Sequence, residues 1–360
     1  MKAGYKKIKI ITGVIEKDET SKNKKAIDYG LAILKLIQAF LVIAAHNYNK
    51  DSTKNKIIIF ITRNRHIHVP SFWIMSFHFN CHSLLSLKLK YILRRFLRLL
   101  IPYIGWPIIT WKINHLWNKK YKTRLPDTYR ELKSQLLWGR EFIIALWFQW
   151  NLIAITFMFI IVIFIFRKYS LFIFHLLLVI FYILQYSGFY YEKILQEFPI
   201  YNRYTLIYFF ESVPYAITGF SLGFYNIISF LNKFKIRTLI LSLLIYNAID
   251  DYNILSQVKG LSYVGIKFNI QALCIVFIFS LFPSDKIKNK SLSKFLIMLS
   301  NYTGGIFYTH IPFSKYLAHY FNEIKNGTFL GLIITYLFLY IFCFIGMLIF
   351  GKTPFKYLFC

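Results

Sequence analysis

Acidic side chains and cysteines are both scarce in this chain. Its 360 residues include 15 Asp and Glu against 44 Lys and Arg, which gives a formal net charge of +29. The four cysteines, Cys81, Cys274, Cys343 and Cys360, have neither paired nor metal-type spacing. The chain therefore lacks the disulfide framework of a small secreted domain. The histidines have no cysteine or carboxylate at ligand spacing either, so we expect no metal site.

Two loop motifs of soluble enzymes are missing as well. The sequence contains no glycine-rich phosphate loop and no G-x-S-x-G nucleophile turn. It shows no repeat of fixed period. Apolar residues are abundant instead: 57% of the chain is hydrophobic and 20% aromatic, while only 16% is charged. This composition predicts an integral membrane protein.

The excess of basic residues bears on the partners of the chain. On a soluble protein, such a charge would suggest nucleic acid. Here the basic residues lie between apolar segments, as in cytoplasmic loops beside anionic lipid headgroups. We therefore expect membrane lipids, and no nucleic acid, among the partners.

Ten apolar segments predict the fold class, an all-α polytopic membrane protein with about ten transmembrane helices. They are Ala26–His46, Val69–Leu87, Leu99–Trp117, Phe142–Phe166, Leu171–Ser187, Ile207–Ile228, Thr238–Ile249, Ile266–Phe282, Leu296–Leu317 and Phe329–Phe350. The seventh is short. A polar link, Asn47–His68, contains the β-branched run Ile57–Ile61, and Thr123–Gly139 is polar and predicted to be interfacial.

Basic residues at the segment ends predict the orientation. Residues 1–25 form a Lys-rich tail without the apolar core of a cleaved signal. With this tail inside, Lys and Arg on the cytoplasmic side outnumber those on the other side. We predict a cytoplasmic tail at 1–25, a membrane domain at 26–350 and a short cytoplasmic tail at 351–360. The expected location is the plasma membrane.

The first apolar segment contains two polar groups that lipid-facing helices exclude. Lys35 lies in its middle and His46 ends it. They are eleven residues apart, so a helix would put them on one stripe about 16 Å apart. A lysine near the bilayer centre costs about 2.5–3.5 kcal/mol, so it should face protein or a wet cavity. His46 is either a polar cap at the interface or a general base that takes a proton from a hydroxyl.

Further candidates lie on later segments. Arg94, Arg95 and Arg98 occupy about one helical turn at a membrane boundary, either as a positive-inside anchor or as a clamp for phosphate groups. His310 and Glu211 lie within apolar segments, where ionisable residues are functional candidates by default. The alternative for these two is a mutual hydrogen bond that only stabilises the bundle.

Five stretches resemble the integral-membrane acyltransferase family 3, which includes bacterial polysaccharide and O-antigen O-acetyltransferases. They are LKLIQAFLVIAAH ending at His46, VPSFWIMSFHF from Val69, RRFLRLLIPYIGW from Arg94, LWFQWNLI from Leu146 and TGGIFYTH ending at His310. The resemblance covers about residues 26–350. It implies ten membrane helices and transfer of an acyl group from cytoplasmic acyl-CoA to a hydroxyl on the other face.

The resemblance also implies roles for single residues. The family's catalytic histidine matches His46, and its R-x-x-R motif matches Arg95 and Arg98. Lys35 replaces the usual arginine eleven residues before the histidine, so the charge remains and the bidentate fork is lost. Phe77 replaces a usual small residue.

Together these observations predict an O-acyltransferase with acetyl-CoA as co-substrate, no metal, and a carbohydrate or glycan hydroxyl as acceptor. Arg95 and Arg98, assisted by Arg94, would hold CoA phosphates. Lys35 would serve the CoA or the developing oxyanion. His46 would remove the acceptor proton or carry the acyl group, while Glu211 and His310 would line the path. The alternatives are a glycan or lipid exporter and a non-catalytic member of the same fold.

Overall fold

The structure is a computed structural model that describes residues 29–47, 56–121, 129–138, 146–187, 200–251, 265–282 and 290–360. No strand occurs in these ranges, so the predicted all-α class is confirmed. The predicted tail at 1–25 lies outside them. The helices are α1 (Tyr29–Asn47), α2 (Lys56–Leu85), α3 (Leu89–Tyr121), α4 (Tyr129–Trp138), α5 (Leu146–Phe166), η2 (Arg167–Tyr169), α6 (Ser170–Ser187), α8 (Ile200–Phe224), α9 (Ile227–Leu231), η3 (Asn232–Phe234), α10 (Lys235–Asp251), α11 (Ile266–Ser280), α12 (Lys290–Asn301), α13 (Thr303–Leu317), α14 (Asn322–Lys325), α15 (Phe329–Phe350) and η6 (Pro354–Leu358).

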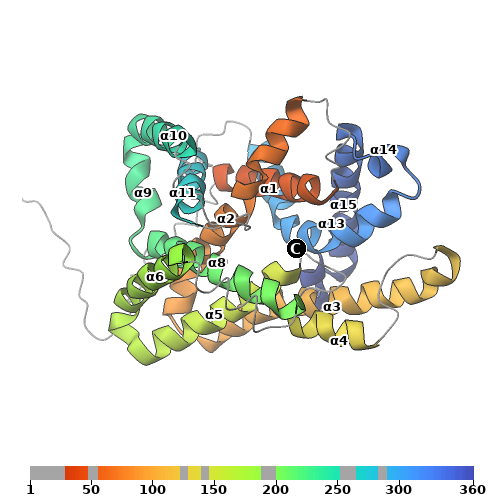
Figure 1. Cartoon of the computed structure of the whole chain (residues 1–360), viewed down its shortest axis with the longest axis horizontal. Coiled ribbons are helices and arrows are strands. Elements are labelled where there is room, and N and C mark those ends of the chain that lie inside the picture. The colour runs from red at the N-terminus through yellow and green to blue at the C-terminus, as the bar shows by residue number, and fades with distance from the viewer. Residues whose placement is uncertain are drawn as a thin grey trace, which may run out of the picture.

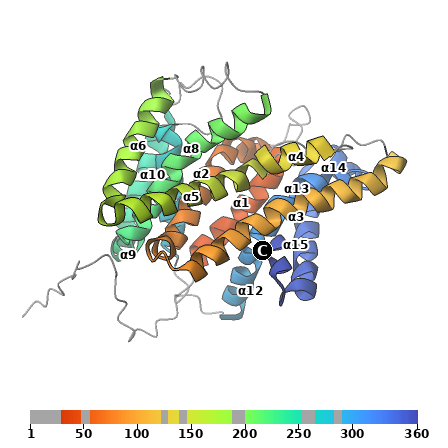
Figure 2. The same ribbon diagram turned by 90° about the horizontal axis from the view of Figure 1, so that it is seen from below.

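α1 and α2 lie at the centre of the bundle (Figure 1). α1 packs against α12, α13 and α15, while α2 packs against α8 and α11. The view at right angles shows α4 beside α3 (Figure 2), where the hydroxyl of Tyr103 donates a hydrogen bond of 2.6 Å to the carbonyl of Leu136. Segments from both ends of the chain therefore enclose α1.

Among the residues that the structure describes, three helical segments are both long and apolar enough to cross a membrane: Tyr29–His46, Leu146–Tyr186 and Phe329–Phe350. The middle one contains two predicted spans, because Arg167 adopts a left-handed conformation (φ 42°) and η2 separates α5 from α6. The chain reverses there, and Phe159 of α5 stacks on Phe174 of α6 with ring centroids 4.2 Å apart. The predicted number of ten spans is not confirmed and stays a prediction.

Two predicted boundaries are wrong. α2 begins at Lys56, so Ile57–Ile61 is helical and not part of a polar link. No glycine or proline interrupts residues 56–69, and β-branched residues cost a helix only a few tenths of a kcal/mol each. The predicted segment Leu296–Leu317 is divided at Tyr302 into α12 and α13. The break precedes Gly305, where a Cβ atom would lie 2.6 Å from the carbonyl oxygen of Phe359.

α8 approaches α2 so closely that their backbones touch. A Cβ atom at Gly219 would lie 2.1 Å from the carbonyl oxygen of Ile74, and one at Gly223 would lie 2.8 Å from that of His78. Small residues four apart permit this approach between membrane helices, where packing drives association. The pair fixes the position of α2 within the bundle.

The chain folds back onto the bundle after α15. The indole of Trp106 on α3 donates a hydrogen bond of 3.0 Å to the carbonyl of Leu358. Phe359 occupies the space beside Gly346, where a Cβ atom would lie 2.3 Å from its ring. Residues 351–360, predicted to be a short tail, thus pack against α3 and α15, while their side of the membrane stays a prediction.

Candidate active site

One stripe of α1 carries Lys35, Gln38, Val42 and His46. Their spacings of three and four residues put them on the same face of the helix. Lys35 is half-buried, Gln38 and Val42 are buried, and His46 is exposed. At 1.5 Å per residue, Lys35 and His46 lie about 16 Å apart along the axis. The structure thus has the helix that the spacing predicted.

His46 lies beside His310 of α13. The two ring centroids are 5.1 Å apart, and His310 is fully buried. The Nδ1 atom of His310 lies 2.7 Å from the carbonyl oxygen of Phe307. Because a carbonyl can only accept, Nδ1 carries the proton in the neutral ring and Nε2 is left as an acceptor. This buried Nε2 has no hydrogen-bond partner among the described residues.

No hydrogen bond joins His310 to Glu211 in the described part of the chain, so their suggested mutual bond is absent. Glu211 lies on α8 and is buried, with Oε1 unpaired among the described side chains. The structure therefore places His310 in the pair with His46, and it does not place Glu211 there.

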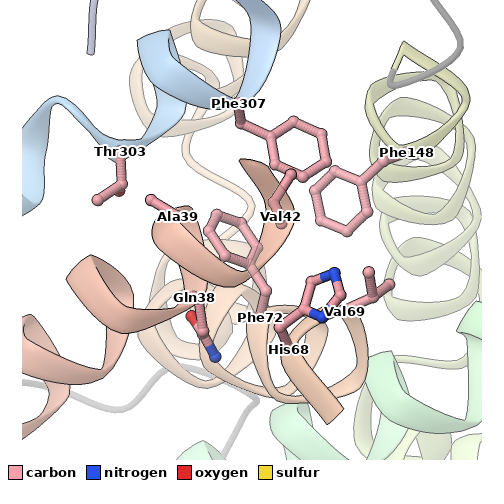
Figure 3. A pocket seen from close by; sticks show the side chains of 9 residues that line it. All are labelled: Gln38, Ala39, Val42, His68, Val69, Phe72, Phe148, Thr303 and Phe307. Atoms are coloured by element: carbon pink, nitrogen blue, oxygen red, sulfur yellow. The ribbon is translucent and has the colours of Figure 1, made fainter. Parts of the chain in front are cut away.

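A narrow pocket lies on the stripe of α1, between the levels of Lys35 and His46 (Figure 3). Its volume of about 10 Å³ leaves room for about one water molecule. α1, α2, α5 and α13 all contribute to its wall. The lining residues are Gln38, Ala39, Val42, His68, Val69, Phe72, Phe148, Thr303 and Phe307.

Three aromatic rings from different helices close this pocket, and we call Phe72, Phe148 and Phe307 the Phe triad. The ring of Phe148 lies 5.3 Å from that of Phe72 and 4.8 Å from that of Phe307, between centroids. The rings of Phe72 and Phe307 are 6.2 Å apart. Figure 3 shows all three directed toward the pocket. The middle of the stripe is therefore apolar and tightly filled.

Polar groups at the edge of the pocket were missed by the sequence analysis. The side-chain amide of Gln38 donates a hydrogen bond of 2.5 Å to the hydroxyl of Ser71, and its Oε1 is unpaired among the described residues. His68 is buried in the wall. Gln38 could have been identified from the sequence, because it is polar and shares the stripe of Lys35. His68 could not have been identified in this way, since its position beside α1 depends on the packing of α2.

Lys35 and Arg95 each lie over a phenylalanine ring of α2. The ammonium of Lys35 lies 5.1 Å from the ring centroid of Phe79, and the guanidinium of buried Arg95 lies 5.1 Å from that of Phe77. Nε of Arg95 donates a hydrogen bond of 3.0 Å to Thr156, and Nη2 is unpaired among the described residues. A buried guanidinium with a free donor is suited to an anionic ligand.

Arg98 lies near these two cations, at the surface of the molecule. It is exposed, its charge acts on both Lys35 and Arg95, and its guanidinium lies 5.8 Å from the ring centroid of Tyr357. None of these three cations has a carboxylate partner in the described ranges. Arg94 is exposed on the same helix. The structure thus brings Lys35, Arg95 and Arg98 together.

Tyr357 of η6 was also missed, because no pattern in the sequence connects it to α3. Burial raises the pKa of the thiol of Cys360 nearby, while the charges of Arg98 and Lys356 lower it. The charges of Arg98 and Lys356 therefore act on the last residues of the chain.

The site has a cationic end, a narrow apolar middle and a histidine pair at the other end. No group of three or more His, Cys, Asp or Glu side chains able to hold a metal occurs in the described ranges. The family model described as an acyltransferase domain matches residues 28–352, from just before α1 to just after α15. No curated protein and no solved structure matches the chain.

Proposed function

This chain belongs to acyltransferase family 3 and is a membrane acyltransferase, and we propose that it transfers an acetyl group from acetyl-CoA to a hydroxyl of a carbohydrate or glycan. One observation carries the proposal: the pocket lies on α1 between a cationic end and a histidine pair. A donor with phosphates at one end and a thioester at the other is suited to such a site.

The cationic end is the proposed donor site. The phosphates of CoA would contact Arg95 and Arg98, with Arg94 assisting. Arg95 offers a buried, unpaired donor, and bonds between arginine and phosphate are charge-assisted and often bidentate. Lys35 lies deeper along the path, where its ammonium would meet either the CoA or the oxyanion that develops on the thioester carbonyl.

The histidine pair is the proposed reaction centre. His46 would take the proton from the acceptor hydroxyl, whose oxygen attacks the thioester carbonyl. The C–S bond then breaks, and the proton passes to the departing CoA thiolate. In a second route, the ring nitrogen of His46 would attack the thioester carbonyl and the C–S bond would break, releasing the CoA thiolate. The acceptor hydroxyl would then attack the acyl-imidazole, the bond to nitrogen would break, and the proton of the hydroxyl would pass to the CoA thiolate. His310, fixed by its bond to Phe307, would hold the ring of His46 in place.

The small size of the pocket supports acetyl as the transferred group. The Phe triad leaves about 10 Å³, so any acyl group would have to displace its aromatic rings, and acetyl would displace them least. Glu211 stands apart from the histidine pair, and we propose that it lines the path from α8.

Transfer itself tests the proposal. Purified protein in liposomes, given acetyl-CoA labelled in its acetyl group, should label an added glycan. Binding of acetyl-CoA without any transfer would instead identify a non-catalytic member of the family. Absence of acetyl-CoA binding would overturn the proposal.

We further propose a plasma-membrane protein with both termini in the cytoplasm. α14 comes directly before α15 and η6 directly after it, so the two lie at opposite ends of α15 and should be on opposite sides of the bilayer. In intact cells, a cysteine replacing Lys325 should react with an impermeant thiol reagent, and one replacing Lys352 should be protected. The reverse labelling pattern would overturn this orientation and with it the cytoplasmic donor site.

Enlarging the pocket should change the choice of acyl chain. Phe148→Ala removes one ring of the Phe triad, so the rate with butyryl-CoA relative to acetyl-CoA should rise. We expect a rise of about tenfold or more, because each methylene that an apolar pocket admits or rejects changes the rate by about that much. The matched control is Phe174→Ala, which removes a fully buried ring of α6 that contacts Phe159 and Phe220 and not the pocket. An active Phe148→Ala enzyme with unchanged selectivity would contradict the assignment.

A further inference from the structure

η6 brings a further basic side chain to the cationic end of the site. Lys356 and Tyr357 follow residue 352, so they lie beyond the part of the chain that the family model matches. The ammonium of Lys356 lies 5.4 Å from the ring centroid of Tyr357, and the guanidinium of Arg98 lies 5.8 Å from the same centroid. One aromatic ring therefore contacts two cations from different helices.

The countercharge for these two cations is not an acidic side chain of the described ranges. Neither Arg98 nor Lys356 forms an ion pair with a carboxylate in the described part of the chain. Both charges lie within about 6 Å of the centre of one ring, so an anion bound beside that ring would be attracted by both. Arg98 is exposed and Lys356 half-buried, so an anion could reach both from outside the bundle.

η6 is held in place independently of such a ligand. The carbonyl of Leu358 accepts the hydrogen bond from Trp106, and Leu358 is buried. Phe359 stacks on Phe350 with centroids 5.7 Å apart and an angle of 6° between the rings. A ligand bound at Tyr357 would therefore meet a preformed surface and lose little affinity to the ordering of the chain.

The cations differ in their burial, and this difference suggests which part of acyl-CoA each of them contacts. From its thioester outward, acyl-CoA consists of the pantetheine arm, the diphosphate and the adenosine with its 3′-phosphate. Arg95 is buried, while Arg98 and Lys356 lie nearer the surface. We propose that Arg98 and Lys356, positioned by the ring of Tyr357, bind the 3′-phosphate of acyl-CoA. This inference rests on the proposed function, because it assumes that acyl-CoA is the donor.

Two donors that differ by one phosphate test the inference. The affinity of the full-length protein for acetyl-CoA and for acetyl-dephospho-CoA would be measured by calorimetry in liposomes or detergent. The unmodified protein should favour acetyl-CoA about three- to tenfold, as expected for a partly exposed charge-assisted contact. Lys356→Gln should remove this preference and leave the affinity for acetyl-dephospho-CoA unchanged.

The controls separate charge from structure. Lys325→Gln makes the same change of charge at the other end of α15 and should keep the preference. Tyr357→Phe should keep it as well, since the ring face remains, whereas Tyr357→Ala should reduce it. Equal affinity of the unmodified protein for both donors, or an equal loss for both in Lys356→Gln, would overturn the 3′-phosphate site. Neither result would affect the proposed acyltransferase, which fails only if acetyl-CoA does not bind at all.

Discussion

Replacement of His46 by alanine should abolish acetyl transfer while acetyl-CoA still binds. The ring of His46 is the only exposed member of the pair with His310, so it is the group that an acceptor hydroxyl would meet. A general base contributes about 10²- to 10⁴-fold to a rate, and the residual transfer should be close to background. Transfer of labelled acetyl to glycan and calorimetric binding of acetyl-CoA measure the two effects separately.

Two further histidine variants sharpen this test. His175 lies on α6 beside Ser221, away from the site, and His175→Ala should keep full transfer. His310→Gln should give an intermediate rate, because His46 remains while its buried neighbour is changed. Transfer by His46→Ala at the unmodified rate would show that another residue takes the proton.

Replacement of Arg95 by alanine should weaken acetyl-CoA binding about ten- to a hundredfold, since a hydrogen bond to a charged group contributes about 1.5–3 kcal/mol. Arg95 is buried against Phe77 and donates to Thr156, so its unpaired Nη2 is held in a fixed direction. Arg95→Lys should recover only part of the affinity, because an ammonium replaces a planar fork. Calorimetric titration of each variant with acetyl-CoA measures the loss.

Arg237→Ala is the matched control, because Arg237 is exposed on α10 and outside the site. Its affinity for acetyl-CoA should equal that of the unmodified protein. If Arg95→Ala folded normally and bound acetyl-CoA with unchanged affinity, the cationic end would be only a membrane anchor.

The polar face of α1 could be predicted because charged and titratable residues are conspicuous in an apolar segment. Lys35 and His46 needed only the period of a helix to be placed on one stripe. The proximity of His46 to His310 was beyond such reasoning, since the two belong to helices far apart in sequence. A single sequence also gives no register between helices, which is why the Phe triad and His68 were missed.

Helix boundaries were less predictable than helix content. The start of α2 at Lys56 was missed because the mostly polar residues 62–68 separate the run Ile57–Ile61 from Val69, and hydropathy does not mark a helix that continues through polar residues. The break at Tyr302 was missed because residues 296–317 form one apolar run, and hydropathy alone does not mark a division within such a run.

The backbone contact of α2 with α8 also bears on the biogenesis of the enzyme. During synthesis α2 enters the bilayer well before α8. Lipid covers the apolar surface of α2 as well as another helix would, so no hydrophobic force drives α2 toward α8. α8 replaces that lipid by direct contact, because Gly219 and Gly223 leave space for the backbone at Ile74 and His78. α13, with His310, is made later still. A chain interrupted before α13 would therefore contain His46 without its neighbour His310, so the cell would obtain the histidine pair only from chains translated beyond α13.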